Sequence, residues 1–364
     1  MAFIARNLVG NKSGFRVYYG SFATHRVYPR GNVSPLIPTM AEKNSPSSKN
    51  RTSVLRDKPP KKPDRLRFSG HQTFVARNGW LEKGVWLVQD DPGGFLAENA
   101  VIRLGVGKNM VESIKYWCLQ TGLIEDADQP GTMRLAQLGR FLFGDGDAPG
   151  VDPFLEDDAS LWLLHYQMAV DAPLSTWSMM LNFYNKPEFR KEDAEAFIAR
   201  RLADLGTSVS ETTLERDVDC FVRTYSGAKG KGGEESFDSP FLALRLLQPT
   251  SDPGLYRFNI GKKSNLPNEL VGYAILRYME SIGGELSVSL SRLLFDPKSP
   301  GQVFKLDQGA LVDAVLELGD RRGAKLSYSD TAGLNTVQYK GDRLRLRKDA
   351  DGFLRSHYAE GARR

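Results

Sequence analysis

Hydrophobic residues recur at helical spacing in several separated stretches of this chain. Met110, Ile114 and Trp117 follow one another at four- and three-residue steps, which predicts the buried face of a helix. A shorter helical pattern, residues 96–104, precedes it. Between the two, Gly105–Gly107 predicts a tight turn, because glycine adopts left-handed backbone conformations without steric cost. The pattern therefore predicts two helices joined by a glycine turn.

A short alternating pattern comes next along the chain. Residues 123–125 and 133–135 predict two strands around a polar turn, and residues 136–143 return to helical spacing. Helix, turn, helix and hairpin is the order of a winged helix-turn-helix. We therefore predict an N-proximal winged helix-turn-helix domain over residues 66–148.

The rest of the chain predicts more helices and one further hairpin. We expect a helical domain over residues 149–250 and a C-terminal domain over 251–348, followed by a tail, 349–364. The predicted helices are 156–169, 191–205, 213–225, 268–282 and 308–319. Strands at 325–329 and 334–340 then fit a second winged domain, and a glycine- and lysine-rich loop is expected at 226–233. The predicted fold class is α+β, mainly α with small β hairpins.

Composition changes this picture mainly at the N-terminus. Residues 1–65 contain 13 of the 49 Lys and Arg residues but three of the 44 Asp and Glu residues, which leaves 36 basic and 41 acidic residues elsewhere. We expect a disordered basic tail there, with residues 49–65 able to touch phosphates. Residues 1–39 hold no acid, which suits an organellar targeting segment; we favour an over-extended start, with translation beginning at Met40.

Cysteine content and hydropathy narrow the class of protein. The two cysteines, Cys118 and Cys220, lie in helical patterns and predict buried thiols in a reducing compartment. No apolar run approaches the roughly 20 residues of a membrane helix, so we expect no membrane partner. These features predict a cytoplasmic protein.

Lys108 and Asn109 start the helix after the glycine turn. A phosphate loop needs a glycine at position 102 and Ser or Thr at 109, but Ile102 and Asn109 stand there. A lysine, an asparagine and free backbone N–H groups at a helix start suit DNA phosphates and base edges, although some winged helices only dock proteins. The residues predicted to contact DNA are Arg67, Arg77, Lys83, Lys108, Asn109 and Lys115.

Two histidines and one acidic segment are candidates for catalysis or metal binding. His71 fits either a catalytic base or a hydrogen-bonded residue that locks a turn, whereas His165, among apolar residues, predicts a satisfied core histidine. Asp152, Glu156 and Asp157 could hold Mg²⁺ or Mn²⁺, but acids before a helix also act as caps, and capping is the interpretation we favour. Asp217 and Asp219 receive the same structural interpretation.

Several motifs of this chain resemble a bacterial family, a domain of unknown function from phage-defence islands typified by the SspB component of single-stranded DNA phosphorothioation systems. The matching pieces are Phe68–Phe74, Gly79–Leu81, Leu104–Met110 with Tyr116–Trp117, Asp152–Glu156 with Leu161–His165, Arg216–Val218, and Ser299–Phe304 with Leu306–Asp307. They begin near residue 66 and extend through most of the chain that follows.

The resemblance implies a DNA-binding protein that nicks one strand so that sulfur can enter the backbone. It also implies three partners besides DNA: a cysteine desulfurase, an ATPase and an adenylate-forming sulfurtransferase. Gln72 stands where the resemblance leads us to expect Glu, which puts nicking in doubt. Two alternatives stay open: a non-catalytic DNA-recognition subunit that recruits the sulfur-modification proteins, and a winged-helix transcriptional regulator.

Overall fold

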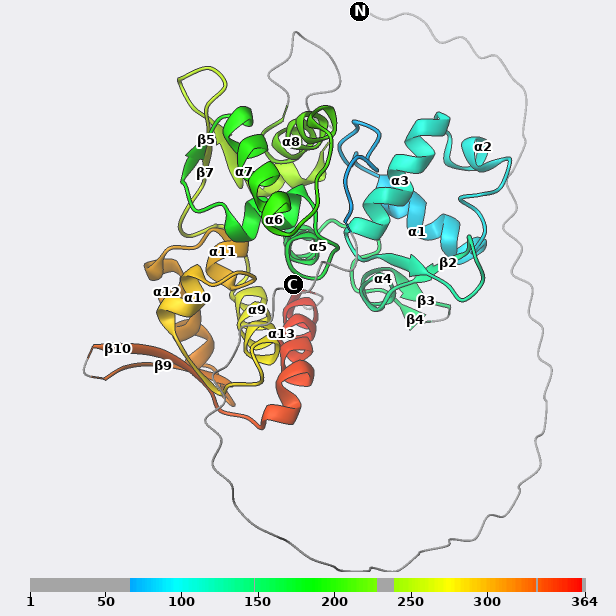
Figure 1. Ribbon diagram of the computed structural model, residues 1–364. Helices are drawn as coiled ribbons and strands as arrows, with labels where there is room; N and C mark the ends of the chain where they lie inside the picture. The colour runs from blue at the N-terminus through cyan, green and yellow to red at the C-terminus, as the bar shows by residue number, and fades with distance from the viewer. Residues whose placement is uncertain (1–65, 147, 228–238, 332, 362–364) are drawn as a thin grey trace, which may run out of the picture. The chain divides into compact units, whose positions relative to one another are not determined.

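The computed structural model describes residues 66–361 apart from 147, 228–238 and 332. This part of the chain is mainly helical with small antiparallel sheets, as Figure 1 shows, which confirms the α+β fold class. The predicted tail of residues 1–65 and most of the predicted loop 226–233 lie outside the described residues. None of the described helices has the length and apolar character needed to cross a membrane.

The N-proximal elements follow the predicted order of helices and hairpin. They are α1 (Trp80–Asp90), α2 (Ala100–Leu104), α3 (Lys108–Gln120), β1 (Ile124–Asp126), β2 (Met133–Leu135) and α4 (Gln137–Phe143). Gly105 adopts φ 66° between α2 and α3, as the turn requires. The α1 helix, which the sequence analysis did not predict, packs on α3; a Cβ on Gly84 would lie 2.4 Å from Cys118 Sγ.

The middle of the chain is built around α5, a helix buried on almost every side. Its elements are β3 (Gly144–Asp145), β4 (Ala148–Pro149), α5 (Asp158–Val170), α6 (Thr176–Phe183), β5 (Glu188–Phe189), α7 (Lys191–Asp204), α8 (Glu211–Ser226), the 3-10 helix η2 (Pro240–Leu244), β6 (Leu247–Pro249) and β7 (Tyr256–Phe258). The strand order β5-β7-β6 is antiparallel throughout. The predicted helices at 156–169, 191–205 and 213–225 are confirmed by α5, α7 and α8.

The C-terminal elements end in a long helix. They are α9 (Asn268–Ser281), β8 (Ser287–Ser289), α10 (Leu290–Phe295), α11 (Pro300–Phe304), α12 (Gln308–Gly319), β9 (Leu326–Thr331), β10 (Leu334–Tyr339), the 3-10 helix η3 (Arg343–Arg345) and α13 (Leu346–Gly361). The predicted helices at 268–282 and 308–319 and the hairpin that follows them are confirmed.

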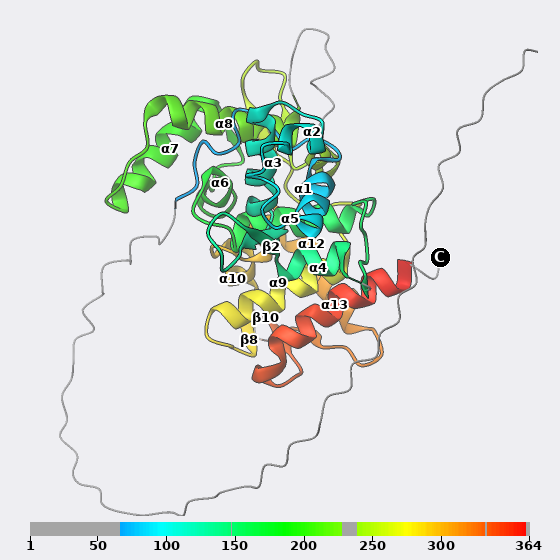
Figure 2. The ribbon, with the colours of Figure 1, turned by 90° about the vertical axis from the view of Figure 1, so that its right-hand side faces the viewer.

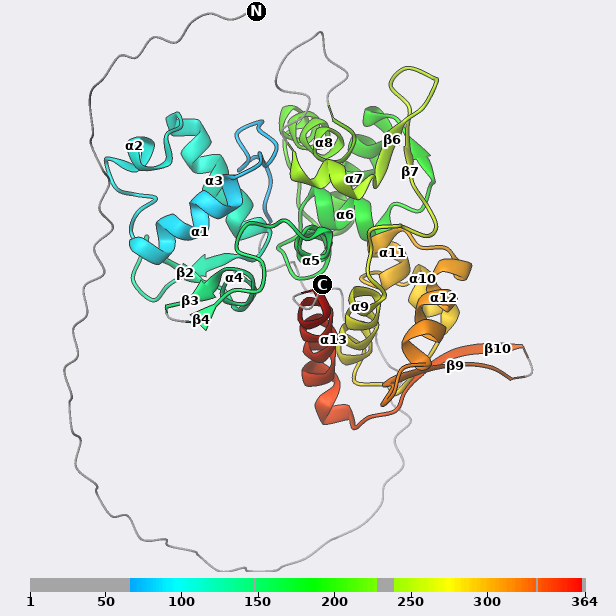
Figure 3. The same cartoon turned by 180° about the vertical axis from the view of Figure 1, so that it is seen from behind.

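The predicted tail from residue 349 is corrected by α13. Leu346, Ala350, Leu354 and Tyr358 repeat every four residues and are buried, so they form an apolar stripe inside a strongly charged segment. The α13 helix packs along α9, and Figures 2 and 3 show the two helices side by side. The division of residues 66–348 into three domains stays a prediction.

Candidate functional site

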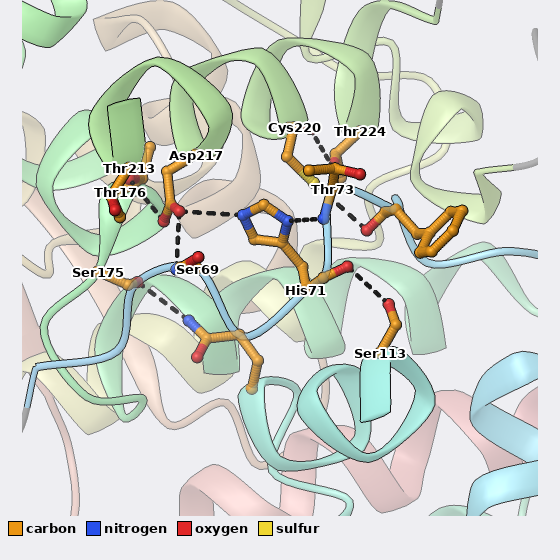
Figure 4. Close-up of polar contacts among 12 residues, drawn as sticks. Ser69, His71, Thr73, Ser113, Ser175, Thr176, Thr213, Asp217, Cys220 and Thr224 are labelled. Carbon is orange, nitrogen blue, oxygen red and sulfur yellow. Dashed lines mark hydrogen bonds and ion pairs between the residues drawn. The ribbon is translucent and has the colours of Figure 1, made fainter. Parts of the chain in front are cut away.

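A loop before α1 carries His71, and Figure 4 shows how the loop is held. The His71 side chain is fully buried, and its Nε2 lies 3.0 Å from Oδ1 of Asp217 on α8. The backbone N–H of Thr73 donates to His71 Nδ1 at 3.0 Å. Because Nδ1 accepts, the proton of the neutral ring sits on Nε2 and is donated to Asp217. Both ring nitrogens of His71 are therefore engaged.

Asp217 gathers hydrogen bonds from separate parts of the chain. Its Oδ1 also accepts the backbone N–H of Ser69 at 2.8 Å, and its Oδ2 accepts the hydroxyl of Thr176 on α6 at 3.3 Å. On the other side of the loop, the Ser113 hydroxyl of α3 donates to the carbonyl of His71 at 3.0 Å. A buried carboxylate needs such donors to offset its lost hydration. The network joins the loop to α3, α6 and α8.

The backbone of this loop is strained. Ser69, Gln72 and Thr73 have φ values of 67°, 50° and 65°, a left-handed conformation that costs a residue with a side chain roughly 1–3 kcal/mol at such sites. Gly70 is required for a different reason, because a Cβ there would lie 2.4 Å from the Tyr116 ring. The His71–Asp217 network offsets the strain and fixes the loop in one shape.

The loop presents polar groups at its outer side. The Gln72 amide donates to Glu112 Oε2 on α3 at 2.7 Å, and Arg223 of α8 donates to the Thr73 carbonyl at 2.6 Å. The side chains of Ser69 and Thr73 are exposed. The arrangement places hydrogen-bonding groups of the loop beside α3 while His71 stays inside.

A general base needs a free lone pair within reach of the proton that it removes. The Nδ1 lone pair of His71 faces the Thr73 N–H, and the ring has no solvent exposure. In this geometry His71 holds the loop and does not face a substrate. A catalytic role for His71 stays a prediction that would require the loop to open.

Three of the predicted DNA-contacting residues share one helix. Lys108 and Asn109 are exposed in the first turn of α3, and Lys115 is half-buried further along it. No side chain caps this helix, whose N-cap is Gly107. Within the described ranges, the side chains of Lys108 and Asn109 make no hydrogen bond or ion pair, so both are available to a ligand.

The other three predicted residues make structural contacts. Lys83 of α1 donates to the Leu104 carbonyl at the end of α2, at 3.1 Å. Arg77 lies with its guanidinium carbon 5.6 Å and 5.3 Å from the ring centres of Phe74 and Trp80. Arg67 contacts the side-chain oxygen of Gln120 at 3.5 Å. Arg67 and Arg77 flank the His71 loop, whereas Lys83 supports the turn before α3.

The acidic segment 152–157 caps the start of α5. Asp152 accepts the backbone N–H groups of Glu156 and Asp157 at 3.0 and 3.1 Å, and the Ser160 hydroxyl at 2.5 Å. Asp157 accepts the Ala159 N–H at 2.8 Å and lies 2.9 Å from His357 Nε2 on α13. The bond to His357 lowers the pKa of Asp157, and the same bond raises the pKa of His357.

These contacts do not fit a magnesium ion. Both oxygens of Asp152 and both oxygens of Asp157 already accept hydrogen bonds, while Mg²⁺ demands carboxylate oxygens turned toward it in octahedral geometry. Glu156 is exposed and supplies one side chain. Among the residues that the structure describes, no group of three or more His, Cys, Asp or Glu side chains could hold a metal ion.

Two predictions about other polar residues have clear outcomes. His165 is a satisfied core histidine, as predicted, with Nδ1 2.7 Å from the Tyr225 hydroxyl and Nε2 2.9 Å from the Val303 carbonyl; burial lowers its pKa to about 4. Asp217 is structural, as interpreted, but it lies inside α8 and holds the His71 loop instead of capping a helix. Its position on the apolar face of α8, with Leu214, Val218 and Phe221, was the signal that this carboxylate is buried and needs a partner.

Comparisons with known proteins identify the family. A family of proteins described as "Protein of unknown function (DUF4007)" matches residues 68–358. The chain belongs to this family. A magnesium ion-bound SspB crystal structure matches with a TM-score of 0.72 and 27% identity, over 81% of this chain and 89% of that chain. An SspB crystal structure matches with a TM-score of 0.71 and 26% identity, over 82% and 89%.

The match to the DUF4007 family and to SspB confirms the resemblance seen in the sequence motifs. The matched range, 68–358, contains the His71 loop, α3 and the acidic segment before α5. None of the curated proteins compared with the chain is similar to it.

Proposed function

We propose that this chain binds DNA as a component of a DNA phosphorothioation and phage-defence system. The observation that carries the proposal is the start of α3, where exposed Lys108 and Asn109 flank an uncapped helix N-terminus. Backbone N–H groups at a helix start attract phosphate, and asparagine can pair with an adenine edge. Residues 80–143 would act as a winged helix, with α3 in the major groove and the β1–β2 hairpin as the wing.

The similarity to SspB supports the place of this chain in the system. It leads us to propose the same partners as the sequence motifs did, namely a cysteine desulfurase, an ATPase and an adenylate-forming sulfurtransferase. One of the similar structures is of magnesium ion-bound SspB, which favours a metal-dependent nickase as the second candidate function.

The geometry supports DNA recognition better than strand cleavage. His71 is buried with both ring nitrogens engaged, and the carboxylates of Asp152 and Asp157 already accept hydrogen bonds. Of the residues predicted for cleavage, His71, Asp152 and Asp157 therefore have structural partners in this conformation. We accordingly favour a DNA-recognition subunit that recruits the sulfur-modification proteins.

DNA binding by Lys108 and Asn109 can be tested with single substitutions. Lys108→Ala should weaken binding to every DNA sequence and reduce the slope of log affinity against log salt by about 1, because one phosphate contact is lost. Asn109→Ala should instead reduce discrimination between sequences by about 1–3 kcal/mol. Fluorescence anisotropy over a salt series measures both effects, and Lys340→Ala, at an exposed lysine after β10, is the control. Unchanged binding in both variants would move α3 to a protein-docking role.

Nicking can be tested on supercoiled plasmid with Mg²⁺ or Mn²⁺, with a chelator as control. The recruiting subunit that we favour leaves the plasmid supercoiled under all conditions. Conversion to the open circle that the chelator stops would establish the nickase instead. In that case His71→Ala decides whether this histidine takes part, since a variant that folds and nicks normally excludes it as the base.

A further inference from the structure

A second candidate site lies at the start of α9, away from the His71 loop. A cavity of about 380 Å³ opens there, lined by the first residues of α9, by α12 and by the end of α13. Ligand pockets measure roughly 300–1,000 Å³, so the cavity is large enough for a small ligand. Its lining includes Lys263, Pro267, Asn268, Arg321 and His357.

Lys263 is a buried cation in the wall of this cavity. Its exposed fraction is 7%, and its Nζ donates to the carbonyls of Gly261 at 2.6 Å and Lys305 at 3.2 Å. An ammonium group has three donors, so one N–H of Lys263 has no acceptor among the described residues. No carboxylate of the described chain lies within ion-pair distance of it. A buried charge in this situation favours an anion as its partner.

The start of α9 adds donors to the same wall. The N-cap residue Pro267 offers no capping side chain, and the backbone N–H groups of Asn268 and Glu269 donate to no other described residue. These are the free donors of a helix of 14 residues, whose dipole places partial positive charge at this end. Lys263 and the helix start are independent features that favour the same kind of ligand.

The acidic residues that line the cavity are either paired with an arginine or exposed. Arg321 pairs with Glu269 and, at 3.7 Å, with Glu317. Glu360 is exposed. Lys262, the neighbour of Lys263, lies 3.5 Å from Asp313 and is itself largely exposed. Lys263 is thus the lining cation that lacks a carboxylate partner within the described residues.

We infer that this cavity binds a phosphate-type oxyanion, either inorganic phosphate or the phosphate of a nucleotide, between Lys263 and the first N–H groups of α9. Burial lowers the pKa of Lys263 to about 8, although Asp307 opposes the shift, and a bound anion would keep the amine protonated. Helix N-termini bind tetrahedral oxyanions through the same kind of N–H groups. This inference does not rest on the proposed DNA-binding function.

Calorimetric titration of the full chain with inorganic phosphate and, separately, with a nucleoside 5′-monophosphate tests the inference. Lys263→Met should weaken binding at least tenfold, whereas Lys262→Met, which removes an exposed neighbouring charge, should change it less than threefold. Binding of both ligands assigns the site to the phosphate group alone, and binding of the nucleotide only assigns it to a nucleotide. No binding of either ligand at millimolar concentration overturns the inference, as does equal binding by both variants and the wild type.

A second variant covers the case in which Lys263→Met fails to fold. Asn268→Pro removes one N–H donor at the first position of α9, where proline is tolerated, and the extended backbone of Pro267 (ψ 142°) suits a residue before proline. This variant should fold and bind phosphate at least threefold more weakly. Unchanged phosphate affinity in folded Asn268→Pro would exclude the helix start as part of the site.

Discussion

His71 and His165 show how differently two buried histidines can be used. His165 bridges Tyr225 and Val303 among the rings of Trp162 and Phe304, so its contacts tie helices together. The contacts of His71 instead hold a strained loop against a carboxylate. Strained backbone persists only where the surrounding contacts hold it in place, and it is found preferentially at binding and switch regions. We therefore expect the outer side of the His71 loop to contact a partner of this protein.

Asp217→Ala should destabilise the protein by at least about 3 kcal/mol. The substitution leaves the His71 Nε2–H, the Ser69 N–H and the Thr176 hydroxyl without an acceptor, and each buried unsatisfied group costs about 1–3 kcal/mol. Asp219→Ala, two residues along α8, removes partly exposed ion pairs with Lys191 and Arg223 and should cost about 1 kcal/mol or less. Urea unfolding measures both, and similar losses would contradict the role given to Asp217.

The sequence allowed part of this site to be predicted. The unusual loop motif marked His71, but its partner stands 146 residues away, and no local pattern pairs them. An acid on the apolar face of a helix predicts burial, although it does not say what the acid binds. The same limit applies to Lys263, because one of its two acceptors, the Lys305 carbonyl, stands 42 residues away in the sequence.

At the scale of elements, predictions were accurate where the apolar spacing was regular. The α1 helix was missed because Gly84 interrupts its pattern, although that glycine is what lets α1 approach Cys118 on α3. The α6 helix is short and begins with the Ser175 capping box, a signal that is weak without a longer apolar run. In α13 the charged residues between the buried positions hid the stripe.

The contact between α13 and the start of α5 should make stability depend on pH. His357 and Asp157 form a half-buried ion pair; its hydrogen bond raises the pKa of His357, with smaller contributions from Glu269 and Glu360, and lowers the pKa of Asp157. Because the pKa of His357 is higher in the folded protein, this residue stabilises the fold below about pH 6.5, and the effect is lost as pH rises through the folded pKa. Because the pKa of Asp157 is lower in the folded protein, this residue stabilises the fold above about pH 4, and the effect is lost as pH falls through the folded pKa of Asp157.

His357→Gln should therefore cost most between about pH 4 and 6.5, and by no more than about 1 kcal/mol, since solvent screens the pair. At pH 9 the variant and the wild type should differ less. Chemical denaturation of both proteins at pH 5.5 and 9 makes the comparison, and a difference that grows toward pH 9 would contradict the ion pair. Lys262→Gln, at an exposed lysine, serves as the control for general charge effects.

At the scale of the whole described part, contacts join segments that are far apart in the sequence. The Tyr358 hydroxyl of α13 lies 2.8 Å from the Ser160 hydroxyl of α5, and its ring packs 5.6 Å from that of Phe141 on α4. The backbone N–H of Arg67 donates to the Leu174 carbonyl at 2.9 Å. Local periodicity contains no information about such contacts, which explains why the sequence could predict helices better than their packing.

Removal of residues 346–364 should prevent stable folding of the described part. The truncation takes away α13 with its four buried residues, Leu346, Ala350, Leu354 and Tyr358, and exposes the side of α9 that this helix covers. Each large buried side chain contributes roughly 2–5 kcal/mol, so the loss approaches the whole stability of a typical domain, about 5–15 kcal/mol. Leu354→Ala alone should cost about 2–4 kcal/mol. Gly352→Ala, exposed on the same helix with no atom within 4 Å of the added Cβ, should stabilise the protein by about 0.5–1 kcal/mol. A truncated protein that melts at the wild-type temperature would show that α13 is the dispensable tail that its charged sequence suggests.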